Sequence, residues 1–335
     1  MSQQLDSIVY YRAISILMIA AGHCLNIAHL FPRTYGEQLF SNFIVGATSL
    51  FVFVSGYLFH HVFYPRYRFT HFIKGRLLRV AVPYLVLAIP SVFVIHQLNP
   101  LVGDELLKFL TILATGDLYW IYWYIPFICL TFALSPLHVG FISMSTRIQI
   151  VVIVALAVVS MLGHRPVNNI PPWHSVIYFA PVYLIGIFVS QHRENLLRLM
   201  RGREIYLALA ALAMIVLQTE LGQIKNSHKP MLEYQGIDWM FLNKSLMALA
   251  LFFLLERFAG PASRMTRLMA DASFAIFFLH PIGIYLIIKT KSFPVLGNPW
   301  LDLLLATAII VGVSLLIAIA LKKMMGQRSR FVLGY

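Results

Sequence analysis

Ten apolar stretches, each close to the length of a membrane-spanning helix, constrain the fold of this chain more than any other feature. They cover roughly residues 8–28, 40–60, 78–96, 118–136, 148–163, 175–190, 204–219, 240–257, 271–289 and 300–321. A helix needs about 20 mostly apolar residues to cross the hydrocarbon core, and these stretches lack the alternation of a transmembrane β-strand. The sequence therefore predicts an all-α polytopic transmembrane helix bundle of about ten spans, folded as a single membrane-embedded domain over residues 1–335.

The composition fits a surface that faces lipid. Only 12% of the residues are charged, against about 25% in a soluble domain, because a charge that faces lipid is costly. The net charge of +13 taken alone would suit a nucleic-acid binder. The basic residues are scattered over loops rather than gathered on one solvated face, so we expect membrane lipid and no nucleic acid as a partner.

Lys and Arg are distributed unevenly between the loops. If the N-terminus is cytoplasmic, the loops on that side include the basic stretches 66–79, 193–203, 257–267 and 322–330, and the opposite loops hold only scattered basic residues. Short loops rich in Lys and Arg stay in the cytoplasm. The bias predicts that both termini are cytoplasmic and that the number of spans is even.

Two ionisable residues, Arg12 and His23, lie in the first apolar stretch. They are 11 residues apart, which on a helix leaves about 20° between them around the axis and roughly 16 Å along it. Ionisable side chains in a span usually face the bundle interior, so we expect both to line a polar path that Asn26 extends. The alternative for His23 is a structural histidine bonded to a neighbouring helix.

Three cations, Lys74, Arg76 and Arg79, lie in the segment FIKGRLLR at the cytoplasmic start of the third stretch. Arg76 and Arg79 have the spacing of residues that share a helical face, and the planar guanidinium group suits phosphate oxygens. The functional interpretation is capture of a phosphorylated cofactor from the cytoplasm. The alternative, which the spacing alone favours, is an anchor to anionic lipid headgroups.

Three further segments combine aromatic, polar and small residues within spans. FVFVSGY contains Ser55, for which close helix packing is the simplest interpretation. WIYWYIP contains Trp123 and Tyr124, which suit either an interfacial aromatic belt or a stacking platform for a sugar or a wall of an acyl site. SFAIFFLHP places His280 before a helix-kinking proline, at a depth from which it could face the same cavity as His23.

In this order the segments resemble the acyltransferase 3 family of integral membrane acyltransferases. RAISILMIAAGH runs from Arg12 to His23 and resembles the family's first-span signature of an arginine and a histidine with ten residues between them. FVFVSGY, the Arg-x-x-Arg pair in GRLLRVAVPY, WYIP and FFLHP resemble its later motifs. The chain resembles the stand-alone form, which has no appended hydrolase-like domain.

The resemblance implies an enzyme that takes an acyl group, usually acetyl, from acyl-CoA at the cytoplasmic face of a plasma (bacterial inner) membrane. The acceptor is commonly a hydroxyl of a glycan or glycolipid on the far side. Arg76 and Arg79, with Lys74 nearby, would hold the coenzyme phosphates, and Arg12 would line the path. His23 would act as general base, since a base must be neutral and burial disfavours the charged imidazole. Acylation of His23 itself is the alternative.

Other parts of the site stay open at this point. Glu37, Asp117, Glu220 and Asp302 lie nearest the predicted outer mouth, and any of them could orient His23. The twelve histidines are dispersed along the chain, so we expect no metal site. A transporter of a small anion or glycan precursor is the main alternative function, and a scaffold or sensor is a third. Transporters often contain repeated halves, and no such repeat is visible here.

Overall fold

The computed structural model describes residues 5–96, 103–119 and 121–335. Within these ranges the chain forms helices and loops, and a lone β-bridge between Arg165 and His228 is the only strand-like pairing. The all-α prediction is therefore confirmed. Trp120, the first residue of the WIYWYIP segment, lies outside the described residues.

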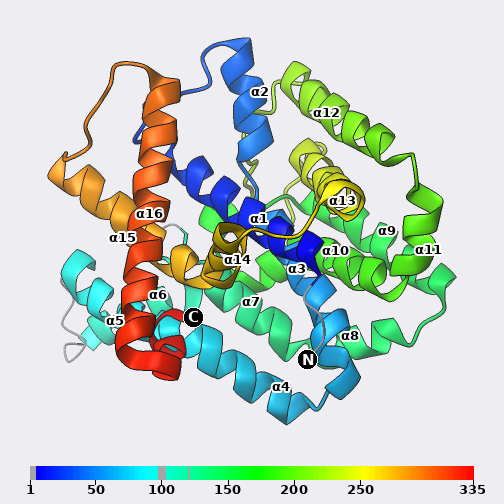
Figure 1. Ribbon diagram of the computed structural model, residues 1–335, viewed down its shortest axis with the longest axis horizontal. Coiled ribbons are helices and arrows are strands. Elements are labelled where there is room, and N and C mark those ends of the chain that lie inside the picture. The colour runs from blue at the N-terminus through cyan, green and yellow to red at the C-terminus, as the bar shows by residue number, and fades with distance from the viewer. Residues whose placement is uncertain (1–4, 97–102, 120) are drawn as a thin grey trace.

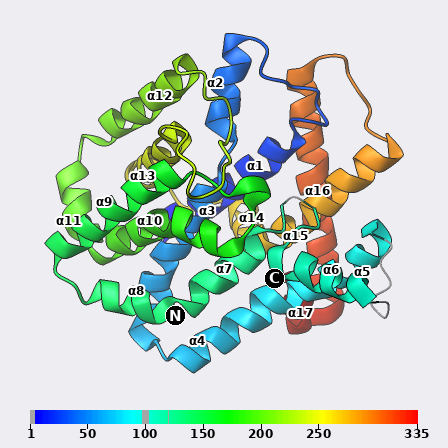
Figure 2. The same ribbon diagram turned by 180° about the vertical axis from the view of Figure 1, so that it is seen from behind.

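The α-helices are numbered in chain order (Figures 1 and 2). They are α1 (Asp6–Cys24), α2 (Tyr35–Ile44), α3 (Thr48–Leu58), α4 (Phe69–Arg76), α5 (Val82–His96), α6 (Gly103–Thr115), α7 (Tyr124–Ala133), α8 (Ser135–Ile142), α9 (Thr146–Gly163), α10 (Pro172–Gln191), α11 (Arg193–Met200), α12 (Glu204–Glu220), α13 (Trp239–Phe258), α14 (Arg264–Asp271), α15 (Ser273–Thr290), α16 (Pro299–Met325) and α17 (Arg330–Leu333). Two π-helical turns, Phe59–Phe63 and Leu77–Ala81, interrupt the second and third helical segments.

Each predicted apolar stretch overlaps a helix, but fewer than ten helices are long enough to span a membrane. Among the described residues, eight helices have the length and composition to cross, or nine if α7 and α8, which meet at a bend of 56°, count as one span. Helix α12 has 17 residues, which is at the lower limit of about 17–25 residues for a span. The helices are therefore consistent with the predicted polytopic bundle of about ten spans.

Helix α6 lies between the third and fourth predicted apolar stretches, where the sequence analysis placed no helix. Its first turn carries Asp104 and Glu105, and Leu106, Leu107 and Leu110 are exposed. With 13 residues the helix is too short to cross the membrane. An amphipathic helix of this kind suits the boundary between lipid and water.

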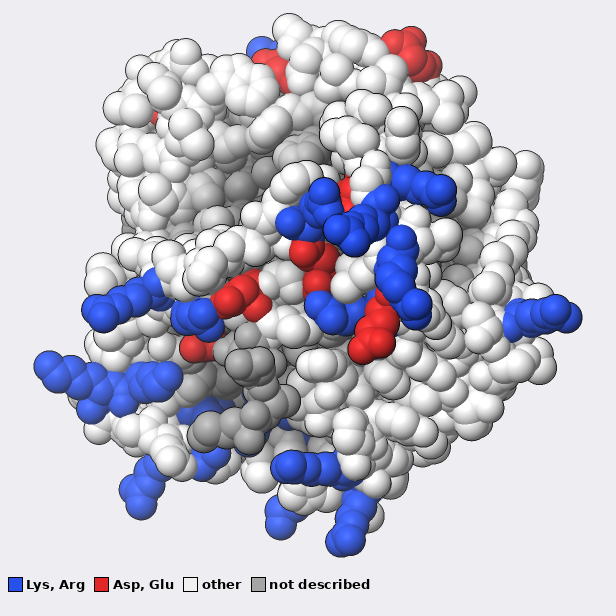
Figure 3. All heavy atoms as spheres, turned by 45° about the vertical axis from the view of Figure 1, so that its right-hand side comes forward, with Lys and Arg blue, Asp and Glu red and all other residues white. Residues whose placement is uncertain are grey.

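The first half of α1 and Gly334, near the C-terminus, both lie near the first turn of α15, since Arg12 donates to Ser273 and Gly334 packs against Phe274. Asp6 at the start of α1 forms a salt bridge with Arg267 in α14. Near the other terminus, Gly334 packs so closely on the third helical segment that a Cβ atom would lie 2.8 Å from the carbonyl oxygen of Arg79. We refer to this as the inner end, and Figure 3 shows Lys and Arg gathered over the lower and middle parts of one face, with few charges near its top. An even number of crossings would bring the termini together in this way.

Helices α3 and α10 form the closest contact in the core. A Cβ atom on Gly56 would lie 2.0 Å from the carbonyl oxygen of Tyr183, and one on Gly186 would lie 2.1 Å from that of Phe53. Small residues allow helix backbones to approach this closely in a membrane. Close packing therefore accounts for the Ser-Gly pair of FVFVSGY.

The second helical segment is broken where it packs against the last turn of α1, at the end opposite to Asp6. We refer to this end as the outer end. Helix α2 ends at Ile44 and α3 begins at Thr48. Between them, Gly46 has φ +83°, which L side chains rarely adopt. The amides of Ser49 and Leu50 donate to the carbonyls of Gly46 and Ala47 in the break, which leaves Thr48 as the first residue of α3 whose amide has no partner within its own helix.

Candidate functional site

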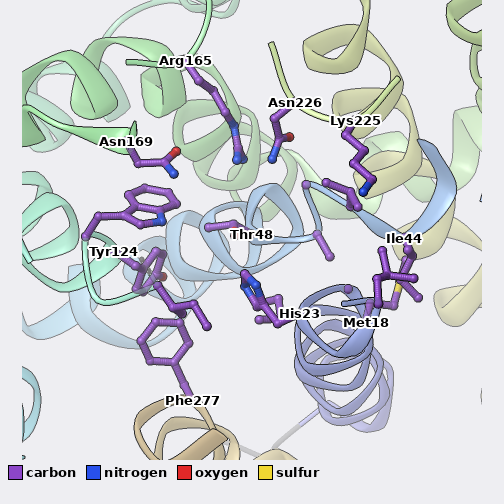
Figure 4. A pocket seen from close by; sticks show the side chains of 18 of the residues that line it. Met18, His23, Ile44, Thr48, Tyr124, Arg165, Asn169, Lys225, Asn226 and Phe277 are labelled. Atoms are coloured by element: carbon purple, nitrogen blue, oxygen red, sulfur yellow. The ribbon is translucent and has the colours of Figure 1, made fainter. Parts of the chain in front are cut away.

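A cavity of about 230 Å³ opens at this break (Figure 4). Its walls come from the last turn of α1, the 44–48 break, the start of α7, α15 and the loops before α10 and α13. The polar or aromatic residues among its lining are His23, Asn26, Thr48, Trp123, Tyr124, Arg165, Asn169, Lys225, Asn226 and Phe277. The cavity therefore lies at the end of α1 opposite to Asp6.

His23 projects into the cavity from α1 (Figure 4). Its ring lies against that of His280 in α15, with 5.6 Å between the ring centroids and 34° between the ring planes. Nδ1 of His280 is 2.9 Å from the carbonyl oxygen of Ile276, and because a carbonyl can only accept, Nδ1 carries the proton. Nε2 of His280 is then an acceptor, and it is buried without a hydrogen-bond partner.

Four of the residues that the sequence singled out surround this space. His23, Asn26, Trp123 and Tyr124 all line the cavity. The indole of Trp123 stacks on Phe179 with 15° between the ring planes. The hydroxyl of Tyr124 is buried without a partner.

Arg12 and Ser55 lie outside the cavity lining. Nη2 of Arg12 donates to Oγ of Ser273 at 3.1 Å. Ser273 begins the same helix, α15, that carries His280, so Arg12 and His23 face one helix as their spacing predicted. Ser55 donates to the carbonyl oxygen of Phe51 one turn earlier at 2.7 Å.

At the inner end the three predicted cations differ in their burial. The guanidinium of Arg76 lies over the ring of Phe63 at 4.3 Å from its centroid, and Nε of Arg76 is buried without a partner. Lys74 and Arg79 are exposed. Arg79 lies within the π-turn Leu77–Ala81, which begins directly after Arg76. None of the three lines the cavity.

Arg165 is the most informative cavity residue that sequence reasoning passed over. Its side chain is 3% exposed, and its guanidinium carbon lies 5.0 Å from the ring centroid of Phe179 and 5.8 Å from that of Trp123. Nε is buried without a hydrogen-bond partner. Figure 4 shows the side chain pointing into the cavity on the side across from His23.

The loop that carries Arg165 is tied to the loop before α13. The amide of Arg165 donates to the carbonyl of Ser227 at 3.4 Å, and its carbonyl accepts from the amide of Lys229 at 3.0 Å. His228 Nδ1 lies 2.7 Å from the carbonyl oxygen of Pro166. Burial and the charge of Arg165 lower the pKa of His228, so the ring is neutral at neutral pH and donates to that carbonyl.

Lys225 and Asn226 bring this second loop to the cavity. Lys225 has φ +67°, and its amide donates to Oδ1 of Asn42 at 2.8 Å. A left-handed lysine costs about 1–2 kcal/mol, so the bond to Asn42 holds the loop in an otherwise unfavourable conformation. Burial lowers the pKa of the Lys225 ammonium. Oδ1 of Asn226 is buried without a partner.

A third cation, Lys244 in α13, lies behind the break. It is 1% exposed, and Nζ donates to the carbonyls of Asn42 at 2.8 Å and Phe43 at 2.6 Å. These carbonyls belong to the last turn of α2, where a cation is favoured by the helix dipole. Lys244 is an ionisable residue within a predicted span, so the rule that singled out Arg12 applies to it equally.

None of the cavity-lining residues, all within the described part of the chain, is acidic. The four carboxylates that the sequence analysis considered as partners of His23 are therefore absent from the lining. Glu37 caps α2, Glu220 accepts from the Tyr35 hydroxyl, Asp302 accepts from the Leu296 amide, and Asp117 is exposed. The site therefore combines a histidine, aromatic walls and uncompensated positive charge.

Asp238 lies just behind this wall. Its Oδ2 accepts from the Tyr178 hydroxyl at 2.8 Å. Burial raises the pKa of the Asp238 carboxyl, and the charge of Arg165 acts on it in the opposite direction. Tyr178 contacts both groups, because its ring lies 5.7 Å from the Arg165 guanidinium carbon.

Comparison with protein families gives a match over almost the whole chain. The family model described as "Acyltransferase domain" covers residues 5–319. No curated protein and no solved structure matches the chain.

Proposed function

The chain belongs to the acyltransferase 3 family that this model describes, and is a membrane acyltransferase; we propose that it transfers an acyl group from cytoplasmic acyl-CoA to a hydroxyl of an extracytoplasmic glycan or glycolipid. Acetyl-CoA is the donor we expect. His23 is the proposed general base. No metal enters the proposed chemistry.

The position of His23 carries the proposal. Its imidazole lines a polar cavity at the end of α1 that is opposite to the chain termini. Helix α1 has 19 residues, which at 1.5 Å per residue spans roughly 28 Å. A base at this depth would meet an acceptor from the outer side and a thioester delivered from the inner side.

The proposed reaction is direct acyl transfer. His23 removes the proton of the acceptor hydroxyl as the oxygen forms a bond to the thioester carbonyl carbon. The carbon–sulfur bond then breaks, its electron pair stays on sulfur, and the proton passes from His23 to the leaving thiolate. The products are an ester and free CoA, and His23 returns to its neutral form.

His280 is the proposed positioning residue for this base. Among the described residues, no acid lines the cavity beside His23. Within the same part of the chain, the Nε2 atom of His280 has no hydrogen-bond partner, and the His280 ring lies beside that of His23. A hydrogen bond from His23 to that nitrogen would fix the tautomer of His23 and leave its other nitrogen bare to accept a proton. A histidine would then do what a carboxylate does in other base–orienter pairs.

The inner cations are the proposed contacts for the CoA phosphates. Lys74 and Arg79 are exposed at the end of the bundle that holds the termini. Arg76 keeps an unpartnered Nε while its guanidinium packs on Phe63. Exposed and partly buried guanidinium groups together suit a phosphorylated ligand that arrives from the inner side.

The test is acyl transfer in inverted membrane vesicles supplied with labelled acetyl-CoA. We expect label to reach glycan inside the vesicles with the wild-type protein. His23→Gln should reduce the rate by about 10²–10⁴-fold, the usual contribution of a general base. Protein level and fold are checked by blotting and circular dichroism.

His29→Gln is the matched control, because His29 is exposed on the loop after α1 and does not line the cavity. It should retain wild-type transfer. Equal transfer by wild type and His23→Gln would remove His23 as the base. Glycan or anion flux that continues without acyl-CoA would instead support the transporter alternative.

A further inference from the structure

We propose that the cavity beside His23 recognises a negatively charged group, a carboxylate or a phosphate, on the acyl acceptor. The acceptor class is then an acidic glycan or glycolipid rather than a neutral one. This inference rests on the proposed function, since it assigns the substrate of the same site.

The first support is a buried cation that forms no salt bridge within the described residues. Arg165 is 3% exposed and lines the cavity, yet its Nε has no partner. Over the described ranges the chain has two salt bridges, Arg193–Glu256 and Arg267–Asp6, and neither involves a cavity residue. A buried charge without a partner is costly, so a bound anion would complete the environment of Arg165.

The second support is that the other charges around the cavity have the same sign. Lys225 lines it, and its ammonium has no hydrogen bond or ion pair within the described residues. Lys244 lies directly behind Gly46, where a Cβ atom would be 3.2 Å from Cε of Lys244. Two basic residues, Arg165 and Lys225, therefore line a cavity whose described lining contains no acidic residue, and Lys244 lies behind it with its ammonium bonded to the Asn42 and Phe43 carbonyls.

The third support is the broken helix. Thr48, the first residue of α3, lines the cavity, and the N-cap residue Ala47 offers no side-chain hydrogen bond to the first turn. The amides at a helix N-terminus, together with its dipole, attract anions. Helices broken near the membrane midplane direct such ends at anionic substrate groups in transporters. Here the end of α3 faces the same space as Arg165.

The alternative use for these charges is stabilisation of the reaction's oxyanion. One transient charge needs only one or two donors, whereas Arg165 and Lys225 bring two charged groups with several donors to the lining. A permanent anion on the acceptor accounts for the surplus. The cavity of about 230 Å³ would hold about eight water molecules, which suits one small acidic unit rather than a long glycan.

The probe is a matched pair of sugars, glucuronate and glucose, binding to the full chain in lipid nanodiscs by titration calorimetry. We expect glucuronate to bind at least tenfold more tightly than glucose, and this preference to fall as salt is raised. Arg165→Gln and Lys225→Gln should each reduce the preference to threefold or less. Arg165→Lys, which keeps the charge but not the planar group, should retain part of it.

Arg33→Gln and Lys289→Gln are the controls, because each removes an exposed cation that does not line the cavity. Both should bind glucuronate as the wild type does. Equal binding of glucuronate and glucose, or an undiminished preference in both Arg165→Gln and Lys225→Gln, would overturn the proposal. The melting temperature of each variant shows whether it is still folded.

A final arm separates the acceptor from the donor as the source of the anion. Succinyl-CoA and acetyl-CoA are compared as competitors of glucuronate. We expect the two to compete equally, because the acceptor fills the anion subsite. Displacement by succinyl-CoA alone would assign the subsite to the acyl group and overturn the proposal. Binding is measured without turnover, so failure here is distinct from failure of the vesicle transfer assay.

Discussion

At the inner end of the bundle the side chains of Lys74 and Arg79 are exposed, whereas at the outer end Arg165 and Lys244 are 3% and 1% exposed. The outer ones are held by stacking on Phe179 and by the last carbonyls of α2.

The difference indicates two kinds of recognition. Exposed cations attract a polyanion from a distance, but salt screens them and each contributes little by itself. Buried cations act at short range in a medium of low dielectric, where an unmet charge is costly. A soluble phosphorylated donor suits the first arrangement, and an acceptor selected for one charged group suits the second.

The largest expected effect tests the inner end. Arg76→Ala combined with Arg79→Ala should weaken acetyl-CoA binding by about 100-fold, since each charge-assisted hydrogen bond contributes about 1.5 kcal/mol. Arg66→Ala with Arg68→Ala is the control, because both residues are exposed on the preceding turn. Titration calorimetry on the purified variants measures the dissociation constant of acetyl-CoA. Unchanged binding would leave lipid anchoring as the role of Arg76 and Arg79.

The next effect tests whether hydrogen bonds of Asn42 stabilise the loop that carries Lys225. Asn42 is fully buried and bonds to Thr219, Gln218 and the amide of Lys225. Asn42→Ala should lower the free energy of unfolding by about 2 kcal/mol, because it leaves buried partners unsatisfied. Asn195→Ala, which removes an exposed partner of Arg198, should change it by less than about 0.5 kcal/mol. Equal melting temperatures for the two variants would contradict this.

A smaller effect concerns pH at the outer site. Burial lowers the pKa of Lys225 below the ordinary value of about 10.4. The positive charge is therefore present at neutral pH and is lost as the pH rises through this lowered pKa. Glucuronate binding should fall about tenfold between pH 7 and pH 10. His23, His228, Arg165 and Lys244 are the other titratable groups nearby, and His228 is already neutral at the start of this range because its pKa is lowered.

Lys225→Arg separates Lys225 from these neighbours, because arginine stays charged throughout. Its glucuronate binding should stay level over the same pH interval. A fall as steep as that of the wild type would assign the titration to another group.

The smallest effect compares one glycine from each end. Gly46 at the outer break has φ +83°, and a Cβ atom would lie 3.2 Å from Oδ1 of Asn226. Gly46→Ala should therefore destabilise the protein by about 1–2 kcal/mol. Gly75 in α4 has nothing within 4 Å of a Cβ position, so Gly75→Ala should stabilise it by about 0.5–1 kcal/mol. Shifts of the same sign would show that the outer break is not under conformational constraint.

The helical bundle and part of the site follow from the sequence because their signals are local. Apolar length identifies a span wherever it packs, and it located all ten stretches, although it missed the bend between α7 and α8. The separation of Arg12 and His23 placed both toward α15, since helical geometry fixes their angle. The Arg-x-x-Arg spacing did not reveal the π-turn Leu77–Ala81, which begins directly after Arg76 and contains Arg79.

By itself the sequence determined the membrane class, the family motifs and the histidine at the end of α1. The tertiary structure alone decided that Arg165, from one loop, and Lys225, from another, meet across the break between α2 and α3. The two are 60 positions apart and share no periodicity. Their meeting depends on backbone bonds between two loops and on a buried amide at Asn42, which are long-range contacts that no local pattern encodes.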